Sequence, residues 1–260
     1  MDVFWTLPPV SRTITALAVV VSALGYSGMI DLMNYVFIKE YIITTQVVPQ
    51  IWRLFTAFMI TKPKFGILLD PYFLYQYGSG LETESSRFSQ PGDFFVYTMF
   101  VGAVIVAIAG FFLNSYMFLQ ALSLAFAYTY AQDNPSRQVS FFIITFDAKY
   151  LPFSMLFLTF IIDGGDAALS QAAGLVAAHL YDFLTRIWPT FGGGRNYIFT
   201  PIMVKRWFGG RAGNVQARPY GTAQQGRQPA DAGAARATGR STGFGGQWDG
   251  RGPGRRLGEQ

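Results

Sequence analysis

The chain of 260 residues contains no cysteine and one histidine, His179. Disulfide bonds, thiol catalysis and cysteine-based metal sites are therefore excluded, and so is a metal centre built from several histidines. Charged residues are also scarce, at 13% of the sequence, which is about half the share usual in a soluble domain. Hydrophobic residues make up 51% of the chain and aromatic residues 17%. This composition is typical of a membrane protein, and we expect no metal and no cofactor.

The C-terminal part of the chain differs in charge and composition from the rest. From Lys205 onward, ten Lys and Arg stand against three Asp and Glu, a net charge of +7 where the whole chain has +5. Beyond about Gly209 the sequence is rich in Gly, Ala, Gln and Arg, so it cannot bury enough apolar surface to offset the entropy of ordering. We therefore predict a membrane domain over residues 1–208 and a disordered basic tail over residues 209–260.

Five stretches resemble membrane-spanning helices, which need about 20 largely apolar residues to cross ~30 Å of hydrocarbon. They are Thr13–Ile30, Phe94–Leu113, Tyr116–Ala131, Tyr150–Ile162 and Ala167–Trp188. A sixth stretch, FGILLDPYFLYQY, follows Lys64 and carries Asp70 and Pro71 in its middle. Its 13 residues would give a helix of only ~20 Å. We predict six spans, of which the second is short.

The distribution of charge predicts the orientation of these spans. An even number of spans puts both termini on one side, and the positive-inside rule places the Arg-rich tail, with Arg12, Arg87 and Arg137, in the cytosol. The long segment Asp31–Lys64 would then face the opposite compartment. The N-terminus has no basic region and no small-residue cleavage site, so we expect the first span to remain as an anchor.

Three motifs in the membrane domain resemble those of a known family. They are IWRLFTAF (residues 51–58), YFLYQYGSGLE (residues 72–82) and FGGGRNYIFTP (residues 191–201). They resemble the Derlin family, the rhomboid-like pseudoproteases of the endoplasmic reticulum, and the resemblance covers about residues 1–208. It implies an all-α membrane protein with a rhomboid-like fold of six transmembrane helices, a lumenal first loop and cytosolic termini. It also implies a non-catalytic role in moving misfolded lumenal or membrane proteins out for degradation.

A short match to the rhomboid protease motif G-x-S-G occurs at residues 25–28, GYSG. Serine attack on an amide needs a base within hydrogen-bond reach and donors for the oxyanion, and rhomboid proteases carry this serine in the fourth span. Ser27 lies near the end of the first span, and Ser123 in the fourth has no glycine beside it. We therefore expect no catalytic residue, a glycine-loosened helix end at Ser27, and a structural hydrogen bond for His179. An active rhomboid intramembrane serine protease is the alternative.

Ionisable and polar side chains within spans tend to face protein or water and not lipid. Four such residues are predicted to line a cavity: Asp70, Gln76, His179 and Asp182. Together with the short second span, they should thin the nearby bilayer and leave a partly hydrated groove, which lowers the cost of passing a polar chain. Asp163 and Asp166 could add to the lumenal mouth of this groove, although capping the sixth span is the simpler role for Asp166.

Two further motifs come from the first loop and the sixth span. Tryptophan favours the membrane interface, and arginine can reach headgroups or bond carbonyls, so Trp52 and Arg53 could simply seat the first loop. The resemblance to the family's W-R motif implies that they also engage substrates and lipid. Gly174 and Ala178 form a small-x-x-x-small pair that lets another helix approach closely. Derlins have G-x-x-x-G here, so the alanine should widen the approach slightly.

The end of the tail, WDGRGPGRRLGEQ, resembles the SHP box, G-x-G-x-x-L-G, which docks on valosin-containing protein, an AAA+ ATPase. The residues that carry this resemblance are Trp248, Gly252, Gly254, Leu257 and Gly258. The box usually has an aromatic residue two positions before its first glycine, where this chain has Gly250. The chain has no G-x-x-x-x-G-K-[ST] motif, so energy must come from a partner. A solvated basic tail is the alternative, with anionic lipid or RNA binding as lesser options, and we expect no nucleic acid partner.

The resemblance also implies a membrane-embedded RING ubiquitin ligase complex as a partner. The residues leave open whether the working form is a monomer, a homo-oligomer or a half-channel shared with the ligase. A solute transporter is a third functional class, but it would predict paired repeats, and the sequence shows no internal repeat.

Overall fold

The computed structural model describes residues 2–43, 49–63, 65–141, 144–191 and 198–209. The chain divides into two compact units, Met1–Val215 and Gln216–Gln260, and every described residue belongs to the first. The tail and the residues of its SHP-like motif lie outside the described residues, as does most of the FGGGRN sequence. The predicted domain boundary at residue 208 therefore stays a prediction.

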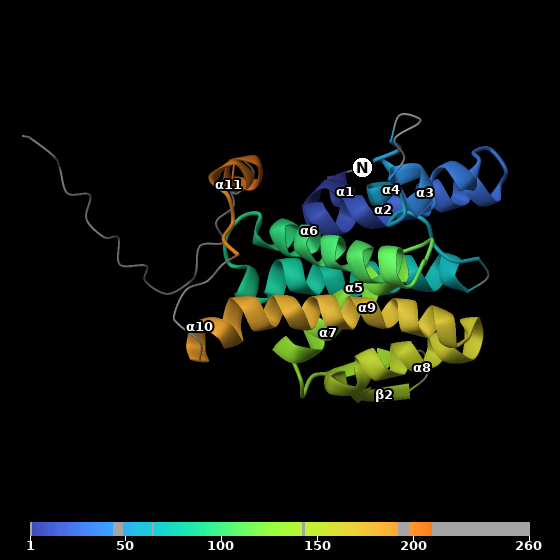
Figure 1. Ribbon diagram of the computed structural model, residues 1–260. Coiled ribbons are helices and arrows are strands. Elements are labelled where there is room, and N and C mark those ends of the chain that lie inside the picture. The colour runs from blue at the N-terminus through green and yellow to red at the C-terminus, as the bar shows by residue number, and fades with distance from the viewer. Residues whose placement is uncertain (1, 44–48, 64, 142–143, 192–197, 210–260) are drawn as a thin grey trace, which may run out of the picture. The chain divides into compact units, whose positions relative to one another are not determined.

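The described part of the chain is mostly helical (Figure 1). Its long helices are α2 (Pro9–Tyr26), α5 (Gly66–Glu84), α6 (Asp93–Ile105), α7 (Leu119–Asp133), α8 (Leu151–Asp163) and α9 (Gly165–Asp182). Helix α6 continues as the π-helix η3 (Val106–Phe112), and α9 continues as the π-helix η5 (Phe183–Ile187) and then α10 (Trp188–Phe191). The short helices are α1 (Asp2–Thr6), η1 (Leu32–Asn34), α3 (Lys39–Ile42), α4 (Arg53–Thr56), η2 (Ser86–Phe88), η4 (Ala148–Tyr150) and α11 (Ile202–Gly209).

Helix α7 lies at the centre of the bundle. Its sequence is apolar or small on nearly every side, as expected for a helix without a polar face, and almost all of its side chains from Leu119 to Ala131 are buried. Helices α5, α8 and α9 pack against α7, while α2 packs against α5 and α6 packs against α9. The other long helices are therefore arranged around α7.

The structure corrects the predicted length of the second span. Helix α5 has 19 residues, or ~28 Å, and so it is not short. Pro71 falls in its second turn and removes one backbone hydrogen bond without ending the helix. Two glycines in the part of α5 beyond the predicted stretch are sites of close packing. A Cβ on Gly78 would lie 3.0 Å from Ser11 of α2, and a Cβ on Gly80 would lie 2.9 Å from Tyr130 of α7.

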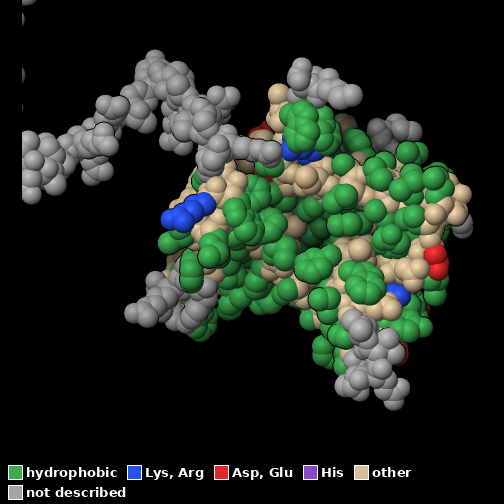
Figure 2. Space-filling model, turned by 90° about the horizontal axis from the view of Figure 1, so that it is seen from above, with side chains coloured by type: hydrophobic (Ala, Val, Ile, Leu, Met, Phe, Trp, Pro, Cys, Tyr) green, Lys and Arg blue, Asp and Glu red, His purple; other side chains and the backbone are tan. Residues whose placement is uncertain are grey.

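Two of the described helices are long and apolar enough to cross a membrane by length and composition, Pro9–Tyr26 and Asp93–Phe112. Only 28% and 39% of their apolar windows are buried, so protein covers little of these helices. Helix α8 likewise exposes Phe153, Phe157, Phe160 and Ile161. Figure 2 shows hydrophobic side chains over most of one face, with few charges between them. Such uncovered apolar surface is expected of a protein in contact with lipid, and membrane crossing by the other long helices stays a prediction.

A β-hairpin that the sequence analysis did not predict follows α7. Strands β1 (Gln138–Phe141) and β2 (Ile144–Asp147) pair in antiparallel fashion. At the base of the hairpin, Arg137 bonds Glu84 at the end of α5 at 2.6 Å. Phe141 stacks on Phe73 of α5, with ring centroids 5.2 Å apart. The hairpin therefore extends back along α5 over the ~16 Å that separate residues 84 and 73 in a helix.

The positions at which α2 begins and ends can both be explained physically. Its first turn is capped by Glu82 of α5, whose carboxylate accepts bonds from the backbone N–H groups of Val10 and Ser11, both at 2.9 Å. A carboxylate at this position complements the helix dipole. The helix ends at Tyr26, and Gly28 has the left-handed φ of 78° that glycine adopts readily. The prediction that the GYSG sequence is a glycine-loosened helix end is confirmed.

Candidate functional site: a polar cluster between helices

Five polar side chains from different segments meet at the end of the bundle where α5, α8 and α9 come together. This polar cluster consists of Lys62, Asp70, Gln120, Asp163 and Gln171. The amide Nε2 of Gln120 donates to Asp70 at 3.4 Å and to Asp163 at 3.3 Å. Lys62 forms an ion pair with Asp163 at 3.3 Å, and its backbone N–H donates to Asp70 at 3.4 Å. These distances lie at the long end of the hydrogen-bond range, so the cluster is loosely bonded.

Two members of the cluster are deeply buried. Asp70 is 6% exposed and Gln171 is 4% exposed. The Oε1 atom of Gln171 has no hydrogen-bond partner among the described residues. A buried polar atom without a partner costs about 1–3 kcal/mol of stability, so this oxygen of Gln171 does not add to the stability of the fold.

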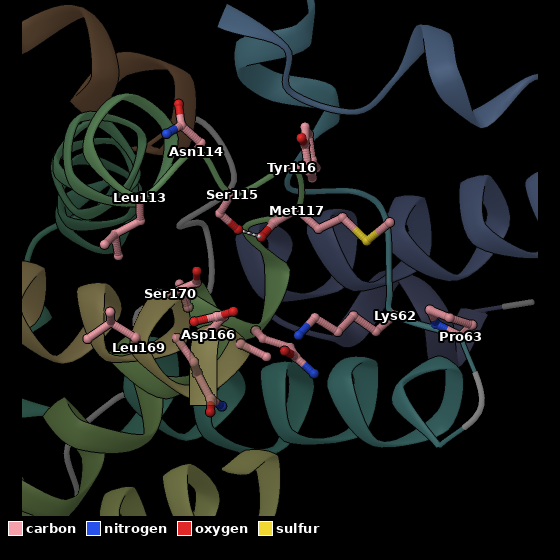
Figure 3. Close-up of a pocket in the computed structure, with 14 residues that line it drawn as sticks. Lys62, Pro63, Leu113, Asn114, Ser115, Tyr116, Met117, Asp166, Leu169 and Ser170 are labelled. Atoms are coloured by element: carbon pink, nitrogen blue, oxygen red, sulfur yellow. Dashed lines mark hydrogen bonds between the residues drawn. The ribbon is translucent and has the colours of Figure 1, made fainter. Parts of the chain in front are cut away.

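Two cavities adjoin the cluster. The larger, about 530 Å³, is lined by Lys62, the link between η3 and α7, and the first turns of α7 and α9. Figure 3 shows Lys62, Ser115, Asp166 and Ser170 around this space. The smaller, about 30 Å³, lies between α5 and α8 and is lined by Asp70, and its volume is about that of one water molecule. Gln120 and Gln171 line both cavities, so polar groups connect the outer space to the gap between α5 and α8.

Two acidic residues were expected at the lumenal mouth of the predicted groove, and the structure gives them different positions. Asp163 belongs to the polar cluster through Lys62 and Gln120. The expectation that Asp166 caps α9 is wrong, because the cap residue is Gly164 and no side chain bonds the helix end. Gly164 has φ 90° and ψ 178°, a conformation that is essentially restricted to glycine. Asp166 lies one residue into the helix and lines the larger cavity.

The other residues predicted to line a cavity lie apart from the cluster. Gln76 is exposed on α5. His179 is exposed on α9 and shares a hydrogen bond of 3.0 Å with the hydroxyl of Tyr128. Asp182 is buried and forms ion pairs with Arg87 at 2.8 Å and with Arg186 at 3.4 Å. Of the four predicted residues, the structure places only Asp70 in the polar cluster.

A second charged group lies at the opposite end of α5 and α9. Arg87 pairs with Asp133 at the end of α7 and with Asp182 of α9, and we call these three residues the Arg87 network. On the surface nearby, Arg137 bonds Glu84 at 2.6 Å, and this hydrogen bond raises the pKa of Arg137 above its ordinary value. No sequence pattern predicts this network, since its members lie far apart in the chain.

The serines considered as nucleophiles bond carbonyl oxygens of their own helices. Ser123 is buried and donates to the carbonyl of Gln120 at 2.9 Å. Ser27 is exposed and donates to the carbonyl of Leu24 at 2.9 Å. Within the part of the chain that the structure describes, neither serine is hydrogen-bonded to His179.

Trp52 and Arg53 are adjacent in the first loop, but the side chain of Arg53 is buried and that of Trp52 is exposed. Arg53 is 3% exposed, and its guanidinium donates to the carbonyls of Met33 at 2.6 Å and Val36 at 2.8 Å. Of the two arrangements open to this arginine, bonding to carbonyls is the one observed. Trp52 is about half exposed, and its indole N–H donates to the carbonyl of Asn34 at 3.3 Å. Arg53 therefore holds the loop together, while Trp52 presents its ring outward.

At Gly174, helix α9 approaches the backbone of α7 very closely. A Cβ placed on it would lie 1.8 Å from the backbone oxygen of Ala121 in α7, a distance that no side chain can occupy. Ala178, one turn further along α9, is fully buried. The small residues of α9 thus pack against α7 within one molecule, as expected for a small-x-x-x-small pair.

These features define a class of protein: a helical membrane protein whose bundle encloses ionisable residues beside open cavities. The Der1-like family model matches residues 7–202. The chain is 32% identical over 219 residues to Derlin-1 of Homo sapiens, covering 82% of this chain and 84% of that protein. It is 32% identical over 162 residues to Derlin-1 of Drosophila melanogaster, covering 60% and 64%, and 28% identical over 210 residues to Derlin-1 of Arabidopsis thaliana, covering 77% and 74%.

The chain belongs to the Der1-like family. The resemblance to Derlins that three sequence motifs indicated is confirmed. Membership supports, at the level of the family, a role in endoplasmic-reticulum-associated degradation and a place in the membrane of that organelle.

Proposed function

We propose that this protein is a non-catalytic component of endoplasmic-reticulum-associated degradation, which binds misfolded lumenal or membrane proteins and aids their passage to the cytosol. In this proposal the six long helices span the membrane in a rhomboid-like arrangement, and both termini are cytosolic. The polar cluster then lies at the lumenal end, since α2 runs from the cytosol to the lumen and α5 returns.

The observation that carries the proposal is the loosely bonded polar cluster beside two cavities. Ionisable residues within a membrane bundle are costly and are typically found where a polar substrate or water passes. Asp70 and Gln171 are buried between α5, α7 and α9, and the cavity of about 530 Å³ lies directly beside them. A polar segment of a client that enters this cavity would find the unpartnered Oε1 acceptor of Gln171 and side chains whose existing bonds are long.

The proposal includes local thinning of the bilayer. The helices that are too short to cross a bilayer of ordinary thickness are α7 and α8, and not α5 as the sequence predicted. These helices have 15 and 13 residues, or ~22 and ~20 Å, against ~30 Å of hydrocarbon. A span shorter than the hydrocarbon is accommodated by thinning of the bilayer or by snorkelling of flanking residues. A thinner layer around the gap between α5 and α8 would shorten the path of a polar chain.

The absence of proteolysis is likewise a proposal. It is supported by the hydroxyl of Ser123, which bonds a carbonyl one turn away, and by His179, which bonds Tyr128. A nucleophile and its base should instead be within hydrogen-bond reach of each other.

The proposal further includes recruitment of a valosin-containing-protein-type AAA+ ATPase by the tail, through Trp248, Gly252, Gly254, Leu257 and Gly258. A membrane-embedded RING ubiquitin ligase would mark the client. Trp52 and Arg53 contribute through the first loop, where Arg53 bonds two carbonyls of the same loop. Loss of Arg53 should therefore disturb the loop as a whole and not one contact to a client.

The first test measures the half-life of a misfolded membrane protein in cells that lack their own family members and express this chain. The triple variant Ser27→Ala, Ser123→Ala, His179→Ala should restore degradation as well as the wild type at equal expression. A stabilised client alongside a folded variant would contradict the non-catalytic proposal.

A second test measures whether the larger cavity contains water, and it uses the absence of native cysteine. Ser170 lines the cavity, whereas Val176, further along the same helix, is exposed on the bundle surface. A membrane-impermeant maleimide should label Ser170→Cys from the lumenal side and leave Val176→Cys unlabelled in native membranes, because thiols react as thiolates in water. Equal labelling of both positions would contradict a hydrated cavity bounded by lipid-facing surface.

A further inference from the structure

A third cavity, about 710 Å³ in volume, lies at the end of the bundle that holds the Arg87 network. Its walls come from η2, the start of α6, the ends of α7 and α9, and residues 198–205. Its size falls within the ~300–1,000 Å³ of ligand pockets, and neither the polar cluster nor the first loop takes part in it.

The cationic side chains that line this cavity are not fully paired with acceptors of the fold. The Nη2 atom of Arg87 is buried and has no hydrogen-bond partner among the described residues. Lys205 lines the same cavity without an ion pair in the described part of the chain. Arg186 also lines it, and its single pair with Asp182 is long, at 3.4 Å. Three cationic side chains therefore line one space, and two of them, Arg186 and Lys205, are at least partly exposed there.

The carboxylates around the cavity, in contrast, are already bonded. Asp93 accepts bonds from the backbone N–H of Gln90 at 2.9 Å and from the hydroxyl of Thr200. Asp133 and Asp182 are paired with Arg87. An incoming anion would therefore meet free donors without breaking the existing pairs, and arginine and lysine are well suited to phosphate oxygens.

Helix α11 indicates where such an anion would come from. Phe208 packs on Phe95 of α6, with ring centroids 5.5 Å apart. Ile202, Met203 and Trp207 of the same helix are each more than 70% exposed. A short helix with large exposed apolar side chains beside Lys205 and Arg206 has the pattern of a helix that lies in the membrane interface, where phospholipid headgroups surround the cavity.

We propose that this cavity binds the phosphate of an anionic phospholipid through Arg186 and Lys205, with Arg87 in the cavity wall and α11 seated in the same leaflet. The bound headgroup places its phosphate against the Arg186 and Lys205 side chains that line the cavity. It also ties α11 to the ends of α7 and α9, and so fixes the segment from which the tail begins. This site is independent of the polar cluster and of any role in degradation.

The test titrates the purified full-length protein in detergent with dioctanoyl phosphatidic acid, dioctanoyl phosphatidylcholine and inorganic phosphate, and follows the thermal unfolding midpoint. Phosphatidic acid should raise the midpoint in a saturable manner. Phosphatidylcholine and inorganic phosphate should bind at least about tenfold more weakly, because one lacks net charge and the other lacks the acyl chains that contact α11.

Two double variants provide the matched comparison. Arg186→Gln with Lys205→Gln should weaken phosphatidic acid binding about tenfold or more, as expected for the loss of charge-assisted bonds. Arg137→Gln with Lys149→Gln removes the same charge from surface residues that do not line the cavity and should stay within about twofold of wild type. Neither Arg186 nor Lys205 is buried, so both double variants should fold.

Equal binding by the two double variants would overturn the proposal, since affinity would then follow net charge and not the cavity. Phosphatidylcholine that binds as well as phosphatidic acid would overturn the preference for an anion. Inorganic phosphate that binds as tightly as phosphatidic acid would overturn the assignment to a lipid.

Discussion

The two ends of the helical bundle hold their charges in different ways. In the polar cluster, Asp70 and Asp163 receive bonds of 3.3 to 3.4 Å. At the other end, Arg87 bonds Asp182 at 2.8 Å, and Glu82 caps α2 with bonds of 2.8 to 2.9 Å. Cavities adjoin both ends, but the short bonds join helices that must stay together, whereas the long ones hold their helices only weakly. We infer that the Arg87 end stabilises the fold and that the polar cluster serves function.

Between these ends, the contact of α9 with α7 should tolerate substitution least. Gly174→Ala places a methyl group 1.8 Å from the Ala121 carbonyl oxygen, so the helices must separate along their whole contact. We expect a loss of more than ~3 kcal/mol, above the usual cost of overpacking, seen as a lower unfolding midpoint in detergent. Gly165→Ala in the same helix is the control, because its methyl group would lie 3.6 Å from Phe160. Similar midpoints for the two variants would contradict the close approach.

The Arg87 network should give the next largest effect. Arg87→Gln leaves Asp133 and Asp182 without their main partner, and the Arg87 side chain is only 13% exposed. Breaking a buried ion pair costs about 3–5 kcal/mol, and the partial exposure of Arg87 places the expected loss at the lower end. Arg137→Gln breaks a pair that is about half exposed, so it should cost at most ~1 kcal/mol. Chemical unfolding of both variants would measure the difference between their free energies of unfolding. Equal losses of stability would contradict the distinction between the buried network and the surface pair.

The cap on α2 should contribute a smaller amount. Glu82→Gln removes the negative charge beside the first turn of α2 and weakens three hydrogen bonds, so we expect a loss of about 1 kcal/mol. Glu84→Gln, two residues further along the same helix, should change stability by less than ~0.5 kcal/mol because its carboxylate is on the surface. A larger loss from Glu84→Gln than from Glu82→Gln would show that the cap is unimportant.

The polar cluster should give the smallest change in stability. Lys62→Met breaks an ion pair of 3.3 Å whose side chains are both 23% exposed, and partly exposed pairs of this kind contribute at most ~1 kcal/mol. The unfolding midpoint should therefore stay close to that of the wild type. A loss as large as that of Arg87→Gln would contradict the inference that this end does not hold the fold together.

Most of the bundle could be predicted from the sequence because its helices are long and apolar. Five predicted spans match described helices to within a few residues. The end of α5 was misplaced because Gly78 and Gly80 resemble helix breakers, while their close contacts with α2 and α7 exist only in the folded protein. The hairpin was missed because QVSF and ITFD, although each alternates polar and apolar residues, are only four residues long, and no Gly, Pro, Asn or Asp lies between them to indicate a turn. Its place is set by the stack of Phe141 on Phe73.

The candidate site was only partly predictable for a similar reason. Asp70 could be identified because an ionisable residue within a span is unusual. Gln120 and Gln171 are common helix residues, and nothing in the sequence indicates that they lie beside the same cavity. His179 and Asp182 share a helix face, but neighbours from other helices decide their partners: Tyr128 bonds the first and Arg87 bonds the second.

The most direct test of the central claim replaces the buried part of the polar cluster with apolar side chains of similar size. The variant Asp70→Leu, Gln171→Met removes one buried carboxylate and one unpartnered amide, a change that is often neutral or stabilising. Its unfolding midpoint and the half-life of a misfolded membrane protein should be measured in parallel. We predict a midpoint equal to or above that of the wild type together with a clearly longer client half-life. A client degraded at the wild-type rate by this folded variant would contradict a functional role for the cluster.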